Sequence, residues 1–296
     1  MGATRTARVE AQAKVNLFLR ILSREPNGYH QLETLFQRIA LADSVTVSSG
    51  GAGRSLDCIG ADVGPVEQNL AWRAAVAYAE AAGGPKDFQV EIVKRIPVGG
   101  GLGGGSADAA AVLRALDALA EKPLDERTLA AIAFSLGADV PYLLSTHSLA
   151  LGSGRGERLH PLESLPSRDV VLAIPPFGVS SADAFGWFAA QKASRHSGTR
   201  ATLPVGRKLE WRTIAALATN DLEGVVVAHH PEVGALRDAL RRHGAIFAQM
   251  SGSGSTVFGV FETAPPKAAL AETATIGARF LRTSTVEQVA TVQLAS

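Results

Sequence analysis

A glycine-rich segment at residues 97–111, Pro-Val-Gly-Gly-Gly-Leu-Gly-Gly-Gly-Ser-Ala-Asp-Ala-Ala-Ala, constrains this chain more than any other feature. Residues 88–96 before it largely alternate apolar and polar side chains, which predicts a half-buried strand. The Ala- and Leu-rich residues after it predict a buried helix that runs to about Leu119, with Ser106 at its start. A helix start has unpaired N–H groups, and glycines let the backbone approach a polyphosphate closely. The segment therefore predicts a phosphate-binding loop between a strand and a helix.

Three other interpretations of these glycines fit less well. A flexible linker would be rich in Gly and Ser on both sides, whereas both flanks here show periodic structure. Gly99, Gly101 and Gly104 satisfy the dinucleotide fingerprint G-x-G-x-x-G, which requires an acidic residue at the end of a second strand about twenty residues later. Residues 121–125 form a predicted turn in that place. The Walker A pattern fails because no Gly-Lys-Ser/Thr closes the loop.

Composition limits the class of protein. The 296 residues are 46% apolar, and no apolar run approaches the roughly 18 residues of a membrane span. The first residues lack the core of a signal peptide, so we expect a cytoplasmic enzyme that binds no membrane. A net charge of +1 gives no sign of a nucleic-acid surface. The single cysteine, Cys58, excludes an internal disulfide and a cysteine-cluster metal site, and we expect it in a strand as a small apolar residue.

The order of predicted elements indicates a mixed α/β fold in two halves. Residues 8–21 alternate so regularly that Lys14 and Asn16 should share one face of a strand, opposite the apolar residues between and around them. A Pro-Asn-Gly turn then leads to Tyr29 and His30. A mixed apolar segment at 31–40, strands at 44–48 and 56–59, and helices at 69–82 and 128–136 complete the first half.

The second half is predicted to begin near residues 164–168, before an apolar strand at 170–174. This boundary divides the chain into domains 1–165 and 166–296. The second domain contains a polar segment at 191–207 that we predict to be mobile. It also contains strands at 245–250 and 256–261, which flank the loop Ser-Gly-Ser-Gly-Ser at 251–255.

Lys14, Asn16, Asp139 and the glycine loops together suit phosphoryl transfer. In that reaction the protein mainly positions the reactants and stabilises charge, so loop amides, a carboxylate at the acceptor hydroxyl and a nearby lysine are the groups required. Each residue also has a plain structural interpretation. Lys14 could be the solvated face of an edge strand, Asp139 only the cap of a helix that begins at Val140, and His30 a surface turn residue. The loop at 251–255 could be an ordinary hairpin connection.

The combination of motifs resembles the GHMP kinases, the superfamily of galactose, homoserine, mevalonate and phosphomevalonate kinases. Its three motifs correspond in order to residues 13–17 (Ala-Lys-Val-Asn-Leu), residues 97–107 and residues 250–254 (Met-Ser-Gly-Ser-Gly). Residues 27–30 (Asn-Gly-Tyr-His) and 136–141 (Leu-Gly-Ala-Asp-Val-Pro) are similar to a branch whose acceptor carries a cytidine diphosphate. The resemblance covers nearly the full length of the chain.

This resemblance implies a fold and a reaction. The fold would be α/β (α+β), with a ribosomal-protein-S5-like, ATP-binding N-terminal domain containing a left-handed βαβ crossover, and an α/β C-terminal domain that contributes to substrate binding. The reaction would transfer the γ-phosphoryl group of ATP, with Mg²⁺, to the 2-hydroxyl of 4-(cytidine 5′-diphospho)-2-C-methyl-D-erythritol, in the non-mevalonate route to isoprenoid precursors. We expect a monomer or weak homodimer with no nucleic-acid partner.

The resemblance also assigns candidate roles to individual residues. Lys14 and Asp139 would be catalytic, and Ser106 would ligate Mg²⁺. ATP would contact Asn69, Leu70, Lys94, Pro97, Val98, Gly99, Gly100, Gly101, Leu102, Gly103, Gly104, Gly105, Ser106 and Ala107. The acceptor would contact Asn16, Tyr29, His30, Asp139, Ser181 and Phe185, with His30 reading the edge of the cytosine and the two aromatic rings stacking on it.

Two alternatives stay open at this stage. Another GHMP small-molecule kinase, acting on homoserine or mevalonate, would share the loops and the Lys14–Asp139 pair, but it would have no use for a base-binding Tyr29-His30 pair. A nucleotide-binding regulator that lost catalysis would share the fold, although retention of both Lys14 and Asp139 speaks against it.

Overall fold

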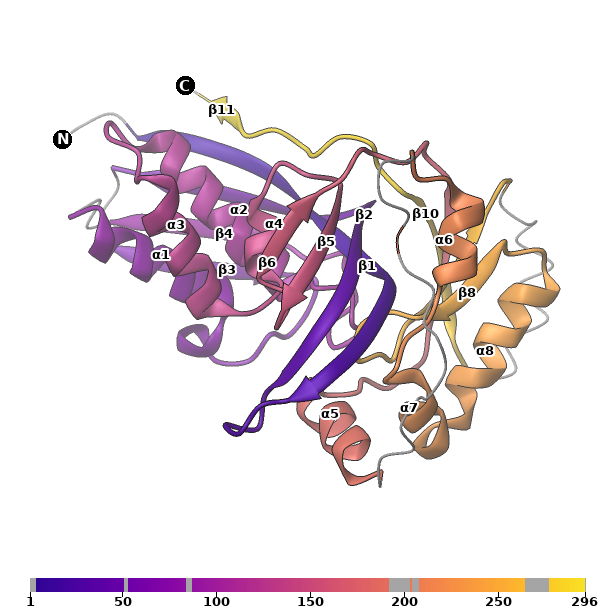
Figure 1. The fold of residues 1–296 in the computed structure, drawn as a ribbon. Coiled ribbons are helices and arrows are strands. Elements are labelled where there is room, and N and C mark those ends of the chain that lie inside the picture. Colours follow the sequence, from indigo (N-terminus) through magenta and orange to yellow (C-terminus); the bar gives the residue numbers. More distant parts are fainter. Residues whose placement is uncertain are drawn as a thin grey trace.

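The computed structural model describes residues 4–50, 53–83, 87–191, 203, 208–263 and 277–295. Two sheets organise this part of the chain (Figure 1). The first has seven strands: the path β11-β1-β2-β4-β3, with β5 beside β2 and β6 beside β5. Their bounds are β1 Arg5–Arg24, β2 His30–Ser49, β3 Arg54–Ile59, β4 Phe88–Val93, β5 Leu149–Gly154, β6 Arg158–Pro161 and β11 Gln293–Ala295.

The β1–β2 hairpin forms the centre of the first sheet and contains its two longest strands. Both strands are 20 residues long and pair antiparallel, with register shifts at three points, including one between Asn16 and Phe18. Bulges of this kind bend a strand and increase its twist. The hairpin accordingly curves across the molecule, and its tip lies beside the second half of the chain (Figure 1).

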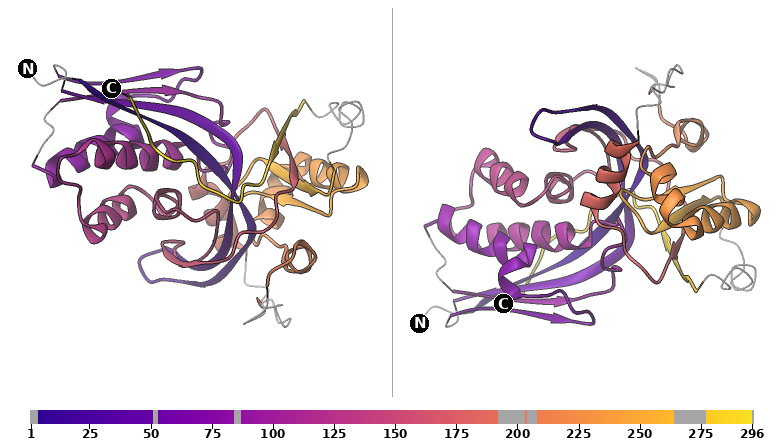
Figure 2. Two further views of the ribbon diagram at one scale, coloured as in Figure 1. Left: turned by 90° about the horizontal axis from the view of Figure 1, so that it is seen from above. Right: turned by 90° about the horizontal axis from the view of Figure 1, so that it is seen from below.

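Helices cover one face of the first sheet (Figure 2). They are α1 Leu70–Ala81, α2 Gly104–Leu119, α3 Glu126–Leu136 and α4 Val140–Leu144, preceded by a short 3₁₀ turn, η1 Val66–Gln68. All the alanines of α2 except Ala118 are buried, and small side chains allow this helix to lie close under the sheet. β3 and β4 pair in parallel and are joined through α1, and the glycine loop connects the end of β4 to the start of α2.

The second sheet is antiparallel throughout, in the order β10-β7-β9-β8. Its strands are β7 Asp169–Ile174, β8 Phe247–Met250, β9 Val257–Phe261 and β10 Arg279–Ser284. The associated helices are α5 Ser181–Ala190, α6 Trp211–Leu217, α7 Glu223–His229 and α8 Pro231–Arg242. α8 packs against β8 and β9 through an apolar stripe that includes Val233, Leu236 and Leu240.

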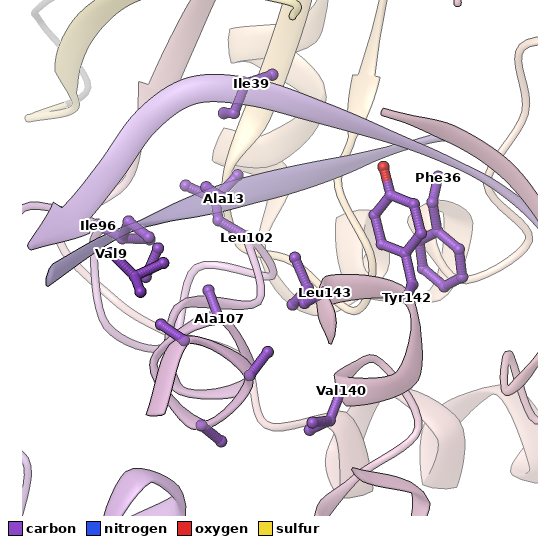
Figure 3. Packing of buried hydrophobic residues seen from close by; sticks show 14 of the residues in the cluster. Val9, Ala13, Phe36, Ile39, Ile96, Leu102, Ala107, Val140, Tyr142 and Leu143 are labelled. Atoms are coloured by element: carbon purple, nitrogen blue, oxygen red, sulfur yellow. The ribbon is translucent and has the colours of Figure 1, made fainter. Parts of the chain in front are cut away.

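The larger buried apolar cluster joins the two halves. Figure 3 shows its part beneath the β1–β2 hairpin, where Leu102 and Ala107 lie below Ala13, and Tyr142 of α4 stacks on Phe36 at 4.7 Å. The same cluster continues into the second half through Val170 and Phe258. A core shared in this way indicates that the two sheets stabilise each other.

The mixed α/β fold is confirmed, and most predicted elements are present. Residues 31–40 and 44–48, predicted as two segments, form the single strand β2 instead, because β1 pairs along its whole length. The segment predicted to be mobile, 191–207, lies almost entirely outside the described residues. The boundary at residue 165 stays a prediction: it falls between β6 and β7, while β11 at the end of the chain returns to pair with β1 (Figure 1).

Among the described helices, none is both long and apolar enough to cross a membrane.

Candidate active site

A single cavity of about 850 Å³ collects nearly all of the predicted site residues. It runs from η1 and the glycine loop to the tip of the β1–β2 hairpin and the start of α5. Its lining includes Lys14, Asn16, Tyr29, His30, Asn69, Leu70, Lys94, every residue of 97–106, Asp139, Ser181 and Phe185. Ala107 is the exception: it is buried in the core under β1, because it lies on the face of α2 that packs against the sheet (Figure 3).

The glycine loop is fixed from three sides. The backbone N–H of Lys14 donates to Leu102 O at 3.0 Å, and the Ser251 hydroxyl donates to Gly101 O at 3.0 Å. The backbone N–H of Thr256 donates to Gly100 O at 3.3 Å. The first and third predicted motifs are therefore both hydrogen-bonded to the second.

The loop leads directly into α2, whose first turn faces the cavity. The helix begins at Gly104, two residues earlier than predicted, after Gly103 in a left-handed conformation with φ of 73°. Ser106 is thus the third residue of the helix, and its side chain remains in the cavity lining. The N–H groups of a first helical turn have no intrahelical partners and carry the positive end of the dipole, so this end of the cavity suits phosphate oxygens.

A polar chain connects β1, β2 and α4 on the cavity floor. Lys14 Nζ lies 3.2 Å from Asp139 Oδ2 and donates to Asn16 Oδ1 at 2.7 Å. Asn16 Nδ2 donates to Thr34 Oγ1 at 2.8 Å, and the Thr34 hydroxyl donates to Phe18 O at 2.7 Å. The Lys14 side chain is only 4% exposed, which contradicts the interpretation of a solvated edge residue, whereas Asp139 is 30% exposed and reaches the cavity.

Asp139 occupies the cap position of α4, but its side chain makes no capping hydrogen bond. The plain interpretation of Asp139 as a helix cap is therefore wrong, because its carboxylate pairs with Lys14. A five-residue helix is too short to be stable alone. Buried Arg38 holds α4 by donating from Nη2 to Tyr142 O, Leu143 O and Ser145 O at 2.8–3.0 Å.

A second charged cluster lies at the glycine-loop end of the cavity. Lys94 Nζ bridges Asp43 Oδ2 at 2.5 Å and Asp108 Oδ2 at 2.7 Å, and all three side chains are buried. Asp43 Oδ1 also accepts the N–H groups of Arg95 and Ile96. Burial, opposed by Lys94 and reinforced by Asp43, raises the pKa of Asp108 to about 7. Among the residues that the structure describes, Asp108 Oδ1 finds no hydrogen-bond partner although it is buried beside the cavity.

Aromatic side chains gather at the opposite end of the cavity. The His30 ring stacks on Phe185 of α5 with centroids 5.1 Å apart and planes inclined by 21°. Burial and the charge of Arg24 lower the pKa of His30 below its ordinary value, so the ring is neutral at neutral pH. Tyr29 does not stack with these rings. It is 58% exposed, and the Arg155 guanidinium lies 3.8 Å from its ring centroid.

Ring stacking also fixes α5, which carries Phe185 and has Ala184 as its one buried residue. Trp187 of α5 stacks on His229 of α7 at 4.0 Å. At the start of α5 the Ser181 and Ser253 hydroxyls lie 3.0 Å apart. The N-terminus of α5 is thereby joined to the loop at 251–255, as part of the same cavity wall.

Sequence reasoning gave no site role to several residues that line the cavity, among them Thr34, Asp108 and Arg155. Gly252 and Ser253 also line the cavity, as part of the third predicted motif. Asp108 lies two residues after Ser106. Its sequence position gave no sign of a place in the site, and only the structure shows its ion pair with Lys94. Arg155 lies between Gly154 and Gly156, which have φ of 75° and 117°. That tight turn was the signal that could have drawn attention to Arg155.

The described residues contain no group of three or more His, Cys, Asp or Glu side chains arranged to hold a metal ion. Mg²⁺ commonly uses one or two protein oxygens together with substrate phosphates and water. A hydroxyl in the first turn of α2, such as that of Ser106, fits such a role.

Known proteins share both the motifs and the fold. Residues 69–146 match the GHMP kinases N terminal domain, and residues 207–275 match the GHMP kinases C terminal domain. A 4-diphosphocytidyl-2-C-methyl-D-erythritol kinase of Solibacter usitatus is 40% identical over 268 residues, covering 88% of this chain and 83% of that protein. The chain belongs to the 4-diphosphocytidyl-2-C-methyl-D-erythritol kinase family of GHMP kinases. Within this family's N-terminal match lie the glycine loop, Asp108 and Asp139, whereas Lys14 precedes it and Arg155 follows it.

Solved structures agree with membership of this kinase family. A crystal structure of 4-(cytidine 5′-diphospho)-2C-methyl-D-erythritol kinase superposes with a TM-score of 0.73 at 36% identity, covering 94% of this chain and 98% of that one. A homoserine kinase from Cytophaga hutchinsonii has a TM-score of 0.66 at 16% identity over 100% of this chain and 98% of that one. The homoserine kinase therefore shares the fold alone, the two-domain GHMP kinase fold.

Proposed function

We propose that this chain phosphorylates the 2-hydroxyl of 4-(cytidine 5′-diphospho)-2-C-methyl-D-erythritol with ATP, in the cytoplasm, within the non-mevalonate route to isoprenoid precursors. The observation that carries the proposal is the Lys14–Asp139 pair, 3.2 Å apart, in a cavity that has the glycine loop at one end and Tyr29 and His30 at the other. Family membership supplies the choice of substrate.

Asp139 is the proposed base or orienting group for the acceptor hydroxyl. Its partly exposed carboxylate accepts the proton as the hydroxyl oxygen bonds to the γ-phosphorus and the bond to the departing ADP oxygen breaks. Lys14 neutralises the carboxylate on one side and can approach the transferring group on the other. Asn16 fixes Lys14 Nζ because its Oδ1 accepts a hydrogen bond from the ammonium group. ATP supplies the phosphoryl group and the acceptor supplies the hydroxyl, while Asp139, Lys14 and Asn16 belong to the chain.

The donor nucleotide would lie along the glycine loop. Its phosphates would face the first turn of α2, with Mg²⁺ held by Ser106, phosphate oxygens and water. The nucleoside would lie toward Asn69, Leu70 and Lys94, which line the same end of the cavity. Asn69 also caps α1 by accepting the N–H of Ala71 at 2.8 Å, so its position is fixed before any ligand binds.

The acceptor would place its cytosine at the aromatic end. A neutral His30 has one donor and one acceptor nitrogen, which suits the polar edge of a pyrimidine. Phe185 and Tyr29 offer apolar faces, and Ser181 lies at the start of α5 within reach of the ribose or phosphates. Because His30 already stacks on Phe185, a bound base would either extend this stack or displace one ring.

The test is ADP release by the purified protein with ATP and Mg²⁺, with three acceptors in parallel: the cytidine-diphosphate substrate, homoserine and mevalonate. We expect turnover on the first alone. Turnover on homoserine or mevalonate would keep the kinase chemistry and overturn the proposed acceptor. Tight ATP binding without turnover on any of the three would favour a regulator that kept the fold and lost catalysis.

Oligomeric state belongs to the same proposal. We propose a monomer or a weak homodimer, because the cavity is lined by one chain and includes both candidate catalytic residues. Sedimentation of the purified protein with and without substrates tests this.

A further inference from the structure

Arg155 occupies a position in the cavity wall that the proposed chemistry does not use. It lies between β5 and β6, and its guanidinium carbon is 3.8 Å from the centroid of the Tyr29 ring. Arg155 Nη2 also donates to Glu25 Oε2 at 2.8 Å. Both Tyr29 and Arg155 line the cavity, so this contact forms part of the wall on which an acceptor would rest.

We propose that Arg155 is a positioning residue for the cytosine of the acceptor, acting through Tyr29. It covers one face of the phenol ring and holds the ring so that the other face is available to the base. This inference rests on the proposed function, because it requires a cytidylyl acceptor at this end of the cavity.

Tyr29 needs such support because little else fixes its side chain. It lies at the tip of the β1–β2 hairpin, and the residue is more than half exposed. Its backbone is held by the turn: Tyr29 O accepts the N–H of Glu25 at 2.7 Å, and Tyr29 N–H donates to Asn27 Oδ1 at 3.1 Å. These bonds fix the main chain and leave the ring free to rotate, so a guanidinium stacked on it reduces the number of rotamers before the ligand binds.

Arg155 itself is well fixed for this purpose. Glu25 receives hydrogen bonds from both Arg155 and Gln31, and the bond from Arg155, with a further one from Asn27, holds the pKa of the Glu25 carboxyl at about 2. The carboxylate is therefore ionised throughout the physiological range. On the other side, the backbone N–H of Arg155 donates to Glu157 Oε2 at 2.7 Å, which fixes the turn between β5 and β6.

Direct binding of the acceptor's diphosphate is the competing role for an arginine in this place. The Arg155 charge is already paired with Glu25, and its planar face lies on Tyr29, so the observed contacts favour the positioning role. The two roles predict different ligand dependence. Loss of a group that acts through Tyr29 lowers the affinity for cytidine, which has no phosphate, as much as the affinity for CDP. A phosphate-binding group affects CDP alone.

The experiment measures dissociation constants by calorimetry for cytidine, CDP and ATP. The variants are Arg155→Met, Arg155→Lys, Tyr29→Leu and the double variant, each checked for folding by its circular dichroism spectrum. Arg158→Met is the matched control, because this neighbouring arginine is 76% exposed and does not line the cavity. Lysine keeps the charge facing Glu25 but lacks the planar guanidinium, so Arg155→Lys tests stacking separately from charge.

We expect Arg155→Met to raise the dissociation constants of cytidine and CDP by the same factor, about threefold. This is the effect of losing a partly exposed cation–π contact. Arg155→Lys should recover little of this loss, and ATP should bind as in the wild type. In the Tyr29→Leu background, Arg155→Met should add no further loss. The Arg158→Met control should bind all three ligands normally.

Three results would overturn the inference while leaving the proposed function intact: loss of CDP affinity without loss of cytidine affinity, an undiminished effect in the Tyr29→Leu background, or no effect at all. A wild-type protein that binds ATP but neither cytidine nor CDP would instead overturn the proposed acceptor, and with it this inference.

Discussion

At the scale of single residues, Lys14 shows how the site constrains its own chemistry. A buried ammonium group is costly unless it is paired and hydrogen-bonded, and here Asp139 and Asn16 together meet that requirement. Because Lys14 must keep a carboxylate beside it, Asp139 is held in place without a substrate. The ion pair that stabilises the cavity floor therefore also preorganises the proposed base.

Replacing Asp139 by Asn tests this residue directly. We expect turnover to fall about a hundredfold or more, because an amide cannot take the proton of the acceptor hydroxyl. The fold should be retained, since Asn Oδ1 can still accept a hydrogen bond from Lys14 Nζ. Single-turnover assays, with a parallel ATP affinity and melting temperature, provide the measurement. Near-normal turnover would remove Asp139 from its assigned role.

His30 gives the site a pH signature. Its lowered pKa means that the ring is neutral from about pH 7 upward and gains a proton only below its ordinary value of about 6.5. We expect the KM for the acceptor to be constant at neutral and alkaline pH and to rise in acid, because a protonated ring no longer offers an acceptor nitrogen to the base. His30→Gln, which does not titrate, should show a flat profile. An identical acid limb in both proteins would assign the titration to another group.

At the scale of elements, the glycine loop depends on space as well as on backbone freedom. Gly99 and Gly101 have nearly the same positive φ, 72° and 74°. A Cβ on Gly101 would lie 2.1 Å from Ser251 O, whereas a Cβ on Gly99 would have its nearest neighbour at 3.8 Å. Substitutions at the two positions therefore distinguish two contributions to the free energy of unfolding. One is the strain of a positive φ, and the other is the clash between the second and third motifs.

We therefore expect Gly99→Ala to lower the free energy of unfolding by about 1 kcal/mol through backbone strain alone. Gly101→Ala should cost roughly 2 kcal/mol more and also raise the KM for ATP, since the loop must shift to relieve the clash. Urea unfolding and initial-rate kinetics on the pair measure both effects. Equal destabilisation of the two variants would show that the contact with Ser251 contributes nothing.

The cluster of Asp43, Lys94 and Asp108 joins β2, the end of β4 and α2 around the loop. The pKa of Asp108 is about 7 in the folded protein, against an ordinary value of 3.8. Between these values the folded state binds more protons than the unfolded state, so this group's contribution to stability is largest in acid and is lost as pH rises toward 7. Asp108→Asn removes the titration. We expect the stability of the wild type to fall relative to this variant as the pH is raised through that window.

Urea denaturation at a series of pH values provides that comparison, with Asp125→Asn as a control. Asp125 is an exposed helix cap whose pKa is lowered by its hydrogen bonds to Thr128. The stability of the wild type relative to Asp125→Asn should therefore rise, not fall, with increasing pH. A stability difference between the wild type and Asp108→Asn that does not change with pH would contradict the assignment.

The sequence predicted whether a segment is a helix or a strand better than it predicted where that element begins and ends. Alternation in residues 8–21 correctly placed Lys14 and Asn16 together, because side-chain direction in a strand follows from local geometry. The continuity of β2 and the role of Asp139 were not predictable in the same way. Both depend on partners far along the chain: β1 for the strand, and Lys14 for a carboxylate that local rules assigned to a helix cap.

At the scale of the whole molecule, the strand that carries Lys14 is attached to the second sheet by a buried side-chain amide. Gln249 of β8 donates from Nε2 to Asn16 O at 2.7 Å and to Leu17 O at 3.0 Å. These carbonyls lie where the register of β1 and β2 shifts. Asn220 similarly donates to Met250 O and Gly252 O, next to the third motif. No periodicity in the sequence could reveal such contacts, and those of Gln249 join residues more than two hundred positions apart.

Gln249→Leu tests whether the two halves fold as one unit. The substitution keeps the volume but leaves two buried carbonyls without this donor, which should lower the free energy of unfolding by about 1–3 kcal/mol. Because the apolar core is shared by both sheets, unfolding should remain a single transition with a lower midpoint. Circular dichroism and the fluorescence of the three tryptophans, Trp72 in the first half and Trp187 and Trp211 in the second, should report the same transition. Gln89→Leu, on half-buried β4 of the first sheet, should change little. Two resolved transitions in the Gln249 variant would mean that these hydrogen bonds, rather than the shared core, hold the halves together.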